Sequence, residues 1–131
     1  MQLFLVRHAD ATPGDPDELR SLSEEGREQA RQLGERLRAE GIEPDVILTS
    51  PLLRARETGA VLARATGSDA EADDRLAPGA TPEAVRAAVV RRGDRVVVVG
   101  HQPDCGRIAA ALTGEEEPSF PPAGMIVIDL P

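Results

Sequence analysis

Three short apolar runs divide the chain, and none of them alternates with polar residues. They cover residues 2–6, 45–49 and 95–100, and the last contains four consecutive valines. Continuous apolar runs of this length are typical of strands that are buried on both faces of a parallel sheet. Valine is stiff about its first side-chain torsion and favours pleated backbone, so residues 95–100 are the clearest strand. Weaker runs at residues 70–72 and 125–130 predict two further strands.

The segments between these strands repeat apolar residues at the spacing of helices. Residues 11–21 are rich in Pro, Gly and Asp and read as a loop, at whose end Ser21 and Glu24 have the spacing of a capping box. The helix that follows is expected to end near Glu40, before Gly41. Its apolar face comprises Ala30, Leu33 and Leu37.

Three further helices are predicted from their ends. Ser50 and Thr81, each followed by proline, are expected N-caps, and the helix after Ser50 should reach about Thr66. Asp104 is expected to cap the last helix, and Gly114 to end it. The three apolar faces are Leu52, Ala55, Gly59 and Leu62; Val85, Ala88 and Val89; and Ile108, Ala109 and Leu112.

Strands that alternate with helices predict an α/β fold. With no repeat, linker or second core in view, residues 1–131 are expected to form a single domain. The expected architecture is a three-layer sandwich, in which helices cover both faces of a mostly parallel sheet.

Composition excludes several function classes. All fifteen basic residues are arginine, so the chain has no lysine for a P-loop, a Schiff base or pyridoxal phosphate. A formal charge of -8, without Tyr or Trp, argues against nucleic acid as a partner. No apolar run is long enough to span a membrane or to act as a signal segment, and the single Cys105 has no disulfide partner, so a cytoplasmic location and no membrane association are expected.

Metal chemistry is also disfavoured. Two histidines are too few for a three-histidine zinc site, and one cysteine cannot build a zinc cluster. Asp10 and Asp104 could join His8 and His101 as ligands, but the arginines nearby would oppose a bound cation. We therefore expect no metal and no other cofactor.

Both histidines follow predicted strands. His8 comes directly after Arg7 at the end of the first strand, and His101 follows residues 95–100. Arg54 falls in the first turn of the helix after the second strand. Because ligands of open α/β sheets bind beyond the carboxyl ends of the strands, two arginines and two histidines are expected to converge there.

A phosphoryl group suits this set of side chains. Guanidinium groups bind phosphate oxygens two at a time, and imidazole can act as nucleophile, base or donor near neutral pH. Arg7, Arg54 and one histidine can neutralise the phosphoryl oxygens, while the other histidine attacks phosphorus and carries the group until water removes it. Cys105 is expected to be an inert core residue, because a cysteine phosphatase would need arginine at position 111, which is Ala111.

Three segments resemble the motifs of the histidine phosphatase superfamily, which has the phosphoglycerate mutase-like fold. Residues 5–9 (LVRHA) resemble its Arg-His-Gly signature, residues 50–58 (SPLLRARET) resemble its Ser-Pro-x-x-Arg-Ala-x-x-Thr motif, and residues 99–101 (VGH) are similar to its third motif. The resemblance extends from Gln2 to the final strand. The small size, the turn at residues 100–103 and the ending at residues 112–114 look most like the SixA-type phosphohistidine phosphatases.

The resemblance implies roles and partners. His8 would be the phosphorylated nucleophile, and Arg7, Arg54 and His101 would form the phosphate pocket, without a metal. The implied substrate is phosphohistidine on a protein, such as a histidine phosphotransfer domain, and the chain is expected to be a monomer. Alternatives are a small-molecule phosphomonoesterase of the same fold and a phosphate-binding module without turnover.

Two departures from the family pattern stand out. Ala9 replaces the glycine after the nucleophile. The acidic residue of a Leu-x-Glu segment, which larger members use as general acid, is absent, because Leu76 is followed by alanine and proline. Four carboxylates could substitute, and the sequence does not choose among Asp10, Asp73, Asp74 and Glu83. Only the loop at residues 11–21 is long enough to cover the site, so an open, shallow pocket is expected.

Overall fold

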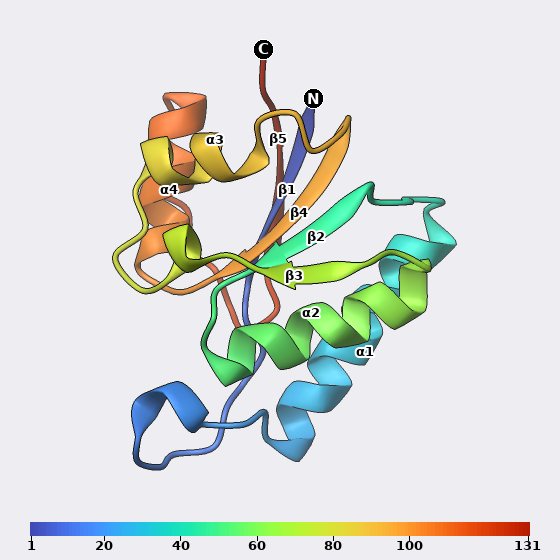
Figure 1. Ribbon diagram of the computed structural model, residues 1–131, viewed down its shortest axis with the longest axis vertical. Helices are drawn as coiled ribbons and strands as arrows, with labels where there is room; N and C mark the ends of the chain where they lie inside the picture. Colours follow the sequence, from blue (N-terminus) through green and yellow to red (C-terminus); the bar gives the residue numbers. More distant parts are fainter.

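Strands and helices alternate along the chain, and the computed structural model describes all 131 residues. The strands are β1 (Gln2–Arg7), β2 (Val46–Thr49), β3 (Ala70–Ala72), β4 (Arg95–Gly100) and β5 (Met125–Asp129). The helices are α1 (Glu24–Ala39), α2 (Leu53–Thr66), α3 (Pro82–Val89) and α4 (Asp104–Thr113), with short 3₁₀ helices η1 (Asp17–Leu19) and η2 (Asp74–Leu76). The predicted α/β fold is confirmed (Figure 1).

The five strands form one sheet in the order β3-β2-β4-β1-β5. All neighbours are parallel except β5, which runs antiparallel to β1, so the sheet is mostly parallel as predicted. In the pairing of β1 with β4, Arg7 lies opposite Gly100. The residues that follow these two strands therefore emerge side by side, and β2 ends next to them on the other side of β4.

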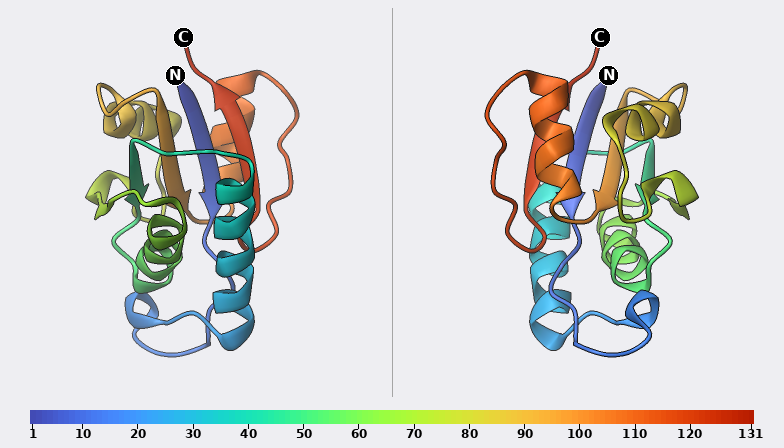
Figure 2. Two further views of the ribbon diagram at one scale, coloured as in Figure 1. Left: turned by 90° about the vertical axis from the view of Figure 1, so that its right-hand side faces the viewer. Right: turned by 90° about the vertical axis from the view of Figure 1, so that its left-hand side faces the viewer.

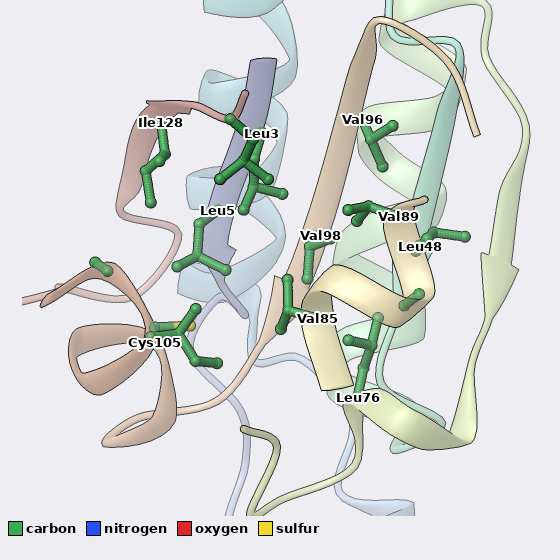
Figure 3. Close-up of a cluster of buried hydrophobic side chains, with 14 of the residues drawn as sticks. Leu3, Leu5, Leu48, Leu76, Val85, Val89, Val96, Val98, Cys105 and Ile128 are labelled. Carbon is green, nitrogen blue, oxygen red and sulfur yellow. The ribbon is translucent and has the colours of Figure 1, made fainter. Parts of the chain in front are cut away.

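Helices cover both faces of the sheet, α1 and α2 on one and α3 and α4 on the other (Figures 1 and 2). Successive side chains of a strand point to opposite faces. Along β1, Phe4 and Val6 accordingly pack in the cluster with α1 and α2, whereas Leu3 and Leu5 join the larger cluster that Figure 3 shows under α3 and α4. Burial on both faces explains the continuous apolar runs.

The predicted start of the first helix is wrong by two residues. Ser23, not Ser21, is the N-cap of α1, and its hydroxyl accepts a hydrogen bond from the Gly26 backbone N–H at 2.9 Å. Ser21 is unavailable as a cap because the chain there is extended. Leu22 forms a β-bridge with Ala11, and the Ser21 carbonyl accepts a hydrogen bond from the Thr12 N–H at 2.8 Å.

Two other predicted caps also have different roles. The N-cap position of α2 is Leu52, and Ser50 instead contacts His101. Asp104 is the first residue of α4 rather than its cap, and its carboxylate accepts a hydrogen bond from the Gly79 N–H at 2.7 Å. Thr81 is the N-cap of α3 as predicted.

The chain ends meet at the edge of the sheet opposite to the carboxyl ends of β1 and β4 (Figure 1). The Met1 amino group donates to the Leu130 carbonyl at 3.0 Å. None of the helices has both the length and the apolar character needed to cross a bilayer.

Candidate active site

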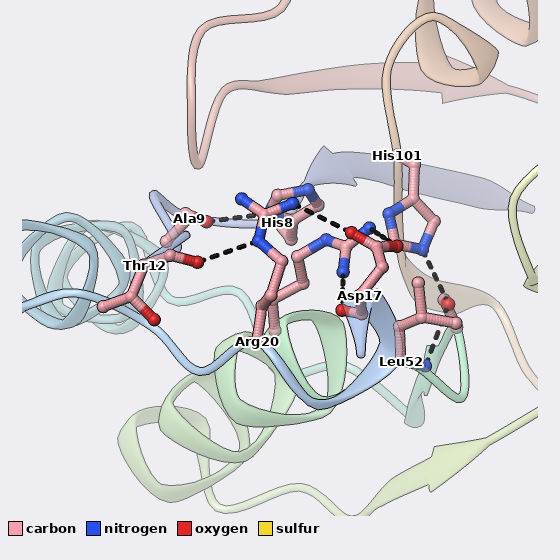
Figure 4. Close-up of polar contacts among 9 residues, drawn as sticks. His8, Ala9, Thr12, Asp17, Arg20, Leu52 and His101 are labelled. Atoms are coloured by element: carbon pink, nitrogen blue, oxygen red, sulfur yellow. Dashed lines mark hydrogen bonds and ion pairs between the residues drawn. The ribbon is translucent and has the colours of Figure 1, made fainter. Parts of the chain in front are cut away.

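The register of β1 and β4 brings the two histidines together. His8 and His101 each follow the last residue of their strand, and the His8 N–H donates to the Gly100 carbonyl at 2.9 Å. The two imidazole rings lie edge to face, with centroids 5.1 Å apart. The predicted convergence of the two histidines at this sheet edge is therefore seen in the structure (Figure 4).

One nitrogen of His8 is held by the backbone. Its Nδ1 lies 2.7 Å from the carbonyl oxygen of Ala9. A carbonyl can only accept, so Nδ1 carries the proton and Nε2 keeps its lone pair. Burial lowers the pKa of His8, and the charges of Arg54 and Arg7 lower it further, against the opposing effect of the Ala9 hydrogen bond. At neutral pH His8 is thus an uncharged imidazole with Nε2 free to attack.

His101 is oriented by the serine that sequence reasoning assigned to a helix cap. Its Nε2 lies 2.7 Å from Ser50 Oγ, which also accepts a hydrogen bond from the Leu52 N–H. Ser50 is fully buried, so its hydroxyl proton needs an acceptor, and Nε2 supplies it. Nδ1 of His101 then carries the ring proton. Burial, followed by the charges of His8 and Arg54, lowers the pKa of His101 to about 4.

Both predicted arginines lie at the same edge. Arg7 donates through Nη1 to the Phe120 carbonyl at 2.9 Å. Arg54 is only 7% exposed, which excludes a solvated surface role, and its Nη1 and Nη2 contact the carbonyl oxygen and the carboxylate of Asp17 at 2.9 and 3.1 Å. The structure therefore gathers the four predicted site residues.

Three buried side-chain atoms have no hydrogen-bond partner in the protein: Arg7 Nε, Arg54 Nε and His101 Nδ1. All three belong to the predicted phosphate pocket, and all three are donors. Buried donors are almost always paired in native proteins. An acceptor-rich anion such as a phosphoryl group would satisfy them together.

Thr58 joins the end of β1 to α2. Its buried hydroxyl accepts from the Ala9 N–H at 3.0 Å and donates to the Arg54 carbonyl at 2.8 Å. This contact fixes the backbone after His8 against the helix that carries Arg54. The threonine of the second motif thus positions two site residues, a role that its place in the sequence did not reveal.

The loop at residues 11–21, here called the 11–21 loop, contributes two residues that sequence reasoning missed. The Asp17 carboxylate forms ion pairs with Arg20 at 3.0 Å and with Arg54 at 3.1 Å (Figure 4). No periodicity marks either residue, because both lie in an irregular polar segment whose shape depends on Arg54. The 11–21 loop therefore reaches the site as expected. It is not alone, because the connection between α4 and β5 reaches the same edge, where the Phe120 carbonyl accepts from Arg7 and the Ala123 N–H donates to the His8 carbonyl.

The four carboxylates considered as general acid lie elsewhere, and none forms a hydrogen bond or ion pair with a site residue. Asp10 accepts from Ser23 at the start of α1, and the carboxylate of Asp73 is bound by Arg75. Asp74 begins η2, and Glu83 lies in the first turn of α3.

The residues considered as metal ligands do not assemble into a site. No group of three or more His, Cys, Asp or Glu side chains has an arrangement that could hold a metal ion. Cys105 is buried, and burial raises the pKa of its thiol to about 12, which makes it a poor nucleophile.

Known proteins share this fold and part of this sequence. The model of the histidine phosphatase superfamily (branch 1) matches residues 3–78. Phosphohistidine phosphatase SixA of Escherichia coli K12 is 30% identical over 99% of this chain and 86% of its own length, and an uncharacterised protein of Picosynechococcus is 37% identical over 86% and 73%. A structure of the protein histidine phosphatase SixA complexed with tungstate aligns at a TM-score of 0.90 with 29% identity, over 99% of this chain and 88% of that one. The chain therefore belongs to the histidine phosphatase superfamily.

Proposed function

We propose that this phosphatase of the histidine phosphatase fold hydrolyses phosphohistidine on another protein, through a phosphohistidine intermediate on its own His8 and without a metal ion. One observation carries the proposal. The three buried donors without a partner are Arg7 Nε, Arg54 Nε and His101 Nδ1. They belong to residues next to His8: the His101 ring lies 5.1 Å from the His8 ring, and the charges of both arginines act on His8, whose Nδ1 is already occupied. This arrangement suits a bound phosphoryl group facing His8 Nε2.

In the first step the two guanidinium groups and His101 bind the phosphoryl oxygens. The fixed charges of the two guanidinium groups and the N–H groups of all three residues stabilise the charge on the equatorial oxygens of a loose transition state. The lone pair on His8 Nε2 forms a bond to phosphorus while the bond from phosphorus to the substrate nitrogen breaks. The Ala9 carbonyl stabilises the positive charge that develops on the His8 ring.

In the second step water attacks phosphorus, the bond to His8 Nε2 breaks, and inorganic phosphate leaves. The substrate imidazole that departs in the first step takes a proton from water, and the hydroxide left behind is neutralised by the proton that the attacking water loses in the second step. Imidazole is a good leaving group, so no protein acid is required, whereas the alkoxide of a sugar phosphate needs one. None of the four candidate carboxylates forms a hydrogen bond or ion pair with a site residue. The one carboxylate at the site, Asp17, is held ionised, because its hydrogen bonds from Arg20 and Arg54 lower its pKa. The lack of a protonated acid favours phosphohistidine as the substrate.

The exposure of the loop tip beside the site supports a protein substrate. Small ligands bind well when most of their surface is buried. The 11–21 loop lies over one side of this edge, and its helix η1 contains no buried residue. A phosphorylated side chain that projects from another protein can reach such a site. The resemblance to SixA over the whole chain points the same way.

The test is a hydrolysis panel in the presence of EDTA. A histidine phosphotransfer domain carrying phosphohistidine, a sugar phosphate and p-nitrophenyl phosphate are compared by kcat/KM, with His8→Ala as the blank. We expect the phosphorylated domain to be preferred by at least about tenfold, which corresponds to about 1.4 kcal/mol of transition-state stabilisation.

Each alternative has its own outcome. Equal or faster hydrolysis of the sugar phosphate would identify a small-molecule phosphomonoesterase. Tight binding of phosphate without turnover of any substrate would identify a phosphate-binding module. Loss of activity with EDTA, restored by a divalent cation, would overturn metal independence.

A further inference from the structure

The arginine that should bind phosphate already binds an anion of the protein itself. Asp17 presents both its carbonyl oxygen and its carboxylate to the Arg54 guanidinium. Carboxylate and phosphate oxygens use the same planar fork of donors. Asp17 occupies Nη1 and Nη2 and leaves only Nε without a partner. A phosphoryl group that binds Arg54 through two donors must therefore displace Asp17 from at least one of them.

The hold of Asp17 is weak enough for such competition. The Asp17 side chain is 59% exposed, in contrast to the buried Arg54. The ends of the loop are fixed by the bridge between Ala11 and Leu22, while η1 at its tip buries nothing. The tip is thus joined to α2 chiefly through the contacts between Asp17 and Arg54, and the carboxylate in them is open to solvent, where water competes with the ion pair.

Arg20 is the second partner of Asp17. Its Nη1 donates to the Asp17 carboxylate at 3.0 Å, and its Nε donates to the Thr12 carbonyl at 2.8 Å. Its charge also lowers the pKa of His8, so it acts on the nucleophile from the loop side (Figure 4). Arg7 and Arg54 act on His8 in the same direction from the sheet edge and α2.

We propose that Asp17 occupies the phosphate position of Arg54 until substrate arrives, and that the entering phosphoryl group displaces it and takes Arg20 as a third guanidinium ligand. The inference rests on the proposed phosphate site. Displacement selects by charge, because a dianionic phosphoryl group outcompetes the single charge of a carboxylate. Carboxylates and phosphodiesters, with one negative charge each, are therefore excluded from the site by Asp17.

Binding of inorganic phosphate, measured by calorimetry at low ionic strength and pH 7.5, tests the role of Asp17. Asp17→Asn removes the competing charge and should tighten phosphate binding by at least about threefold. Asp15→Asn is the matched control, since Asp15 lies in the same loop, is exposed and forms no ion pair. The control should change the dissociation constant by less than about 1.5-fold, because its charge is screened from the site.

The role of Arg20 is tested without Asp17 present. In the Asp17→Asn variant the Arg20 guanidinium is free to bind the anion. Replacing Arg20 by glutamine in that variant removes this ligand and should weaken phosphate binding by at least about threefold. Thermal unfolding of each variant confirms that it is folded. If Arg20→Gln leaves binding unchanged in this background, Arg20 only shapes the loop, and the third-ligand role is wrong.

Equal tightening by Asp17→Asn and Asp15→Asn would overturn the competition, since it would reflect net charge alone. The measurement needs no turnover. If the protein hydrolyses no phosphohistidine but the Asp17→Asn variant binds phosphate more tightly, this inference holds and the proposed function is wrong. If the protein hydrolyses phosphohistidine but Asp17→Asn leaves phosphate binding unchanged, the proposed function holds and this inference is wrong.

Discussion

The side chains near the ends of β1 and β4 are mostly buried, whereas no residue of the neighbouring 11–21 loop is buried. Val6 and Val99 are fully buried in the sheet, and the residues that follow them are fixed by backbone hydrogen bonds and by Thr58. In the loop, Leu19 is 59% exposed and the tip is tied down by ion pairs. The groups proposed for chemistry are thus held rigidly, and the group proposed to compete with substrate is held reversibly.

This difference has a physical basis. Buried strand ends cannot shift without opening the core, so they place His8 and His101 reproducibly. In the ion pair between Asp17 and Arg54 only the carboxylate is exposed, so water can solvate Asp17 when another anion replaces it at the arginine. The following predictions test whether the two regions differ in this way, beginning with the largest expected effect.

Replacing His8 by alanine should reduce kcat by at least about a thousandfold, because it removes the only proposed nucleophile. Rapid quenching of the wild type with labelled substrate should trap an acid-labile, base-stable phosphoryl adduct on His8. Full activity of His8→Ala, or the absence of any adduct in the wild type, would rule out the covalent mechanism.

Arg54→Lys should lower kcat/KM by at least about tenfold, since lysine keeps the charge but loses the planar fork that binds two oxygens. Arg56→Lys is the matched control, two positions along the same helix and bonded only to the Pro51 carbonyl. If the two variants have the same activity and the same thermal stability, Arg54 does not bind phosphate.

Thr58→Val should destabilise the fold by about 1–3 kcal/mol, because the buried Ala9 N–H loses its acceptor. Urea denaturation measures the effect, and Thr58→Ser, which keeps the hydroxyl, should stay closer to the wild type. We also expect kcat to fall in the valine variant. A stable, fully active Thr58→Val would show that the end of β1 needs no such support.

Acidification should titrate both histidines below their ordinary pKa of about 6.5. Because the folded-state pKa values are lowered, the unfolded chain binds protons first as the pH falls below about 6.5, so stability should decrease from there toward pH 4. NMR of the two ring signals measures the midpoints, with His101 expected near 4. A midpoint at or above 6.5 for either ring would contradict the burial of the strand ends.

Leu19→Ala should change the free energy of unfolding by less than about 0.5 kcal/mol, because its side chain lies in solvent at the loop tip. Chemical denaturation gives the value, and Leu5→Ala in the core serves as the contrast, with an expected loss of about 2–5 kcal/mol. Comparable losses would mean that the loop is as tightly packed as the sheet.

Sequence patterns predicted the parts of the fold that burial determines. The runs of β1, β2 and β4 are apolar because both faces are covered, so their positions could be read directly. Placing Arg7, His8 and His101 at one sheet edge followed from strand polarity, and Arg54 followed from the helix after β2. The order of the strands and the pairing of Arg7 with Gly100 needed the structure, because register depends on contacts between distant segments.

The missed contacts depend on partners far away in the sequence. Ser50 resembles a helix cap locally, but His101 is its partner across fifty-one positions. Asp17 and Arg54 are thirty-seven positions apart, and nothing in the polar composition of the 11–21 loop indicates that they meet. Local propensity could not predict either contact, because each is decided by tertiary packing.

The parallel pairing of β1 with β4 limits where this chain can gain or lose residues. A strand advances about 3.3 Å per residue and turns its side chains to the opposite face at each step. Deleting one residue within β4 would therefore carry His101 away from His8 and point it toward the wrong layer of helices. The turn before β4, with Gly93 at a positive φ of 133°, lies at the far end of the strand. Changes of length there leave the pairing of Arg7 with Gly100 intact, so variation in chain length is expected to accumulate at that end.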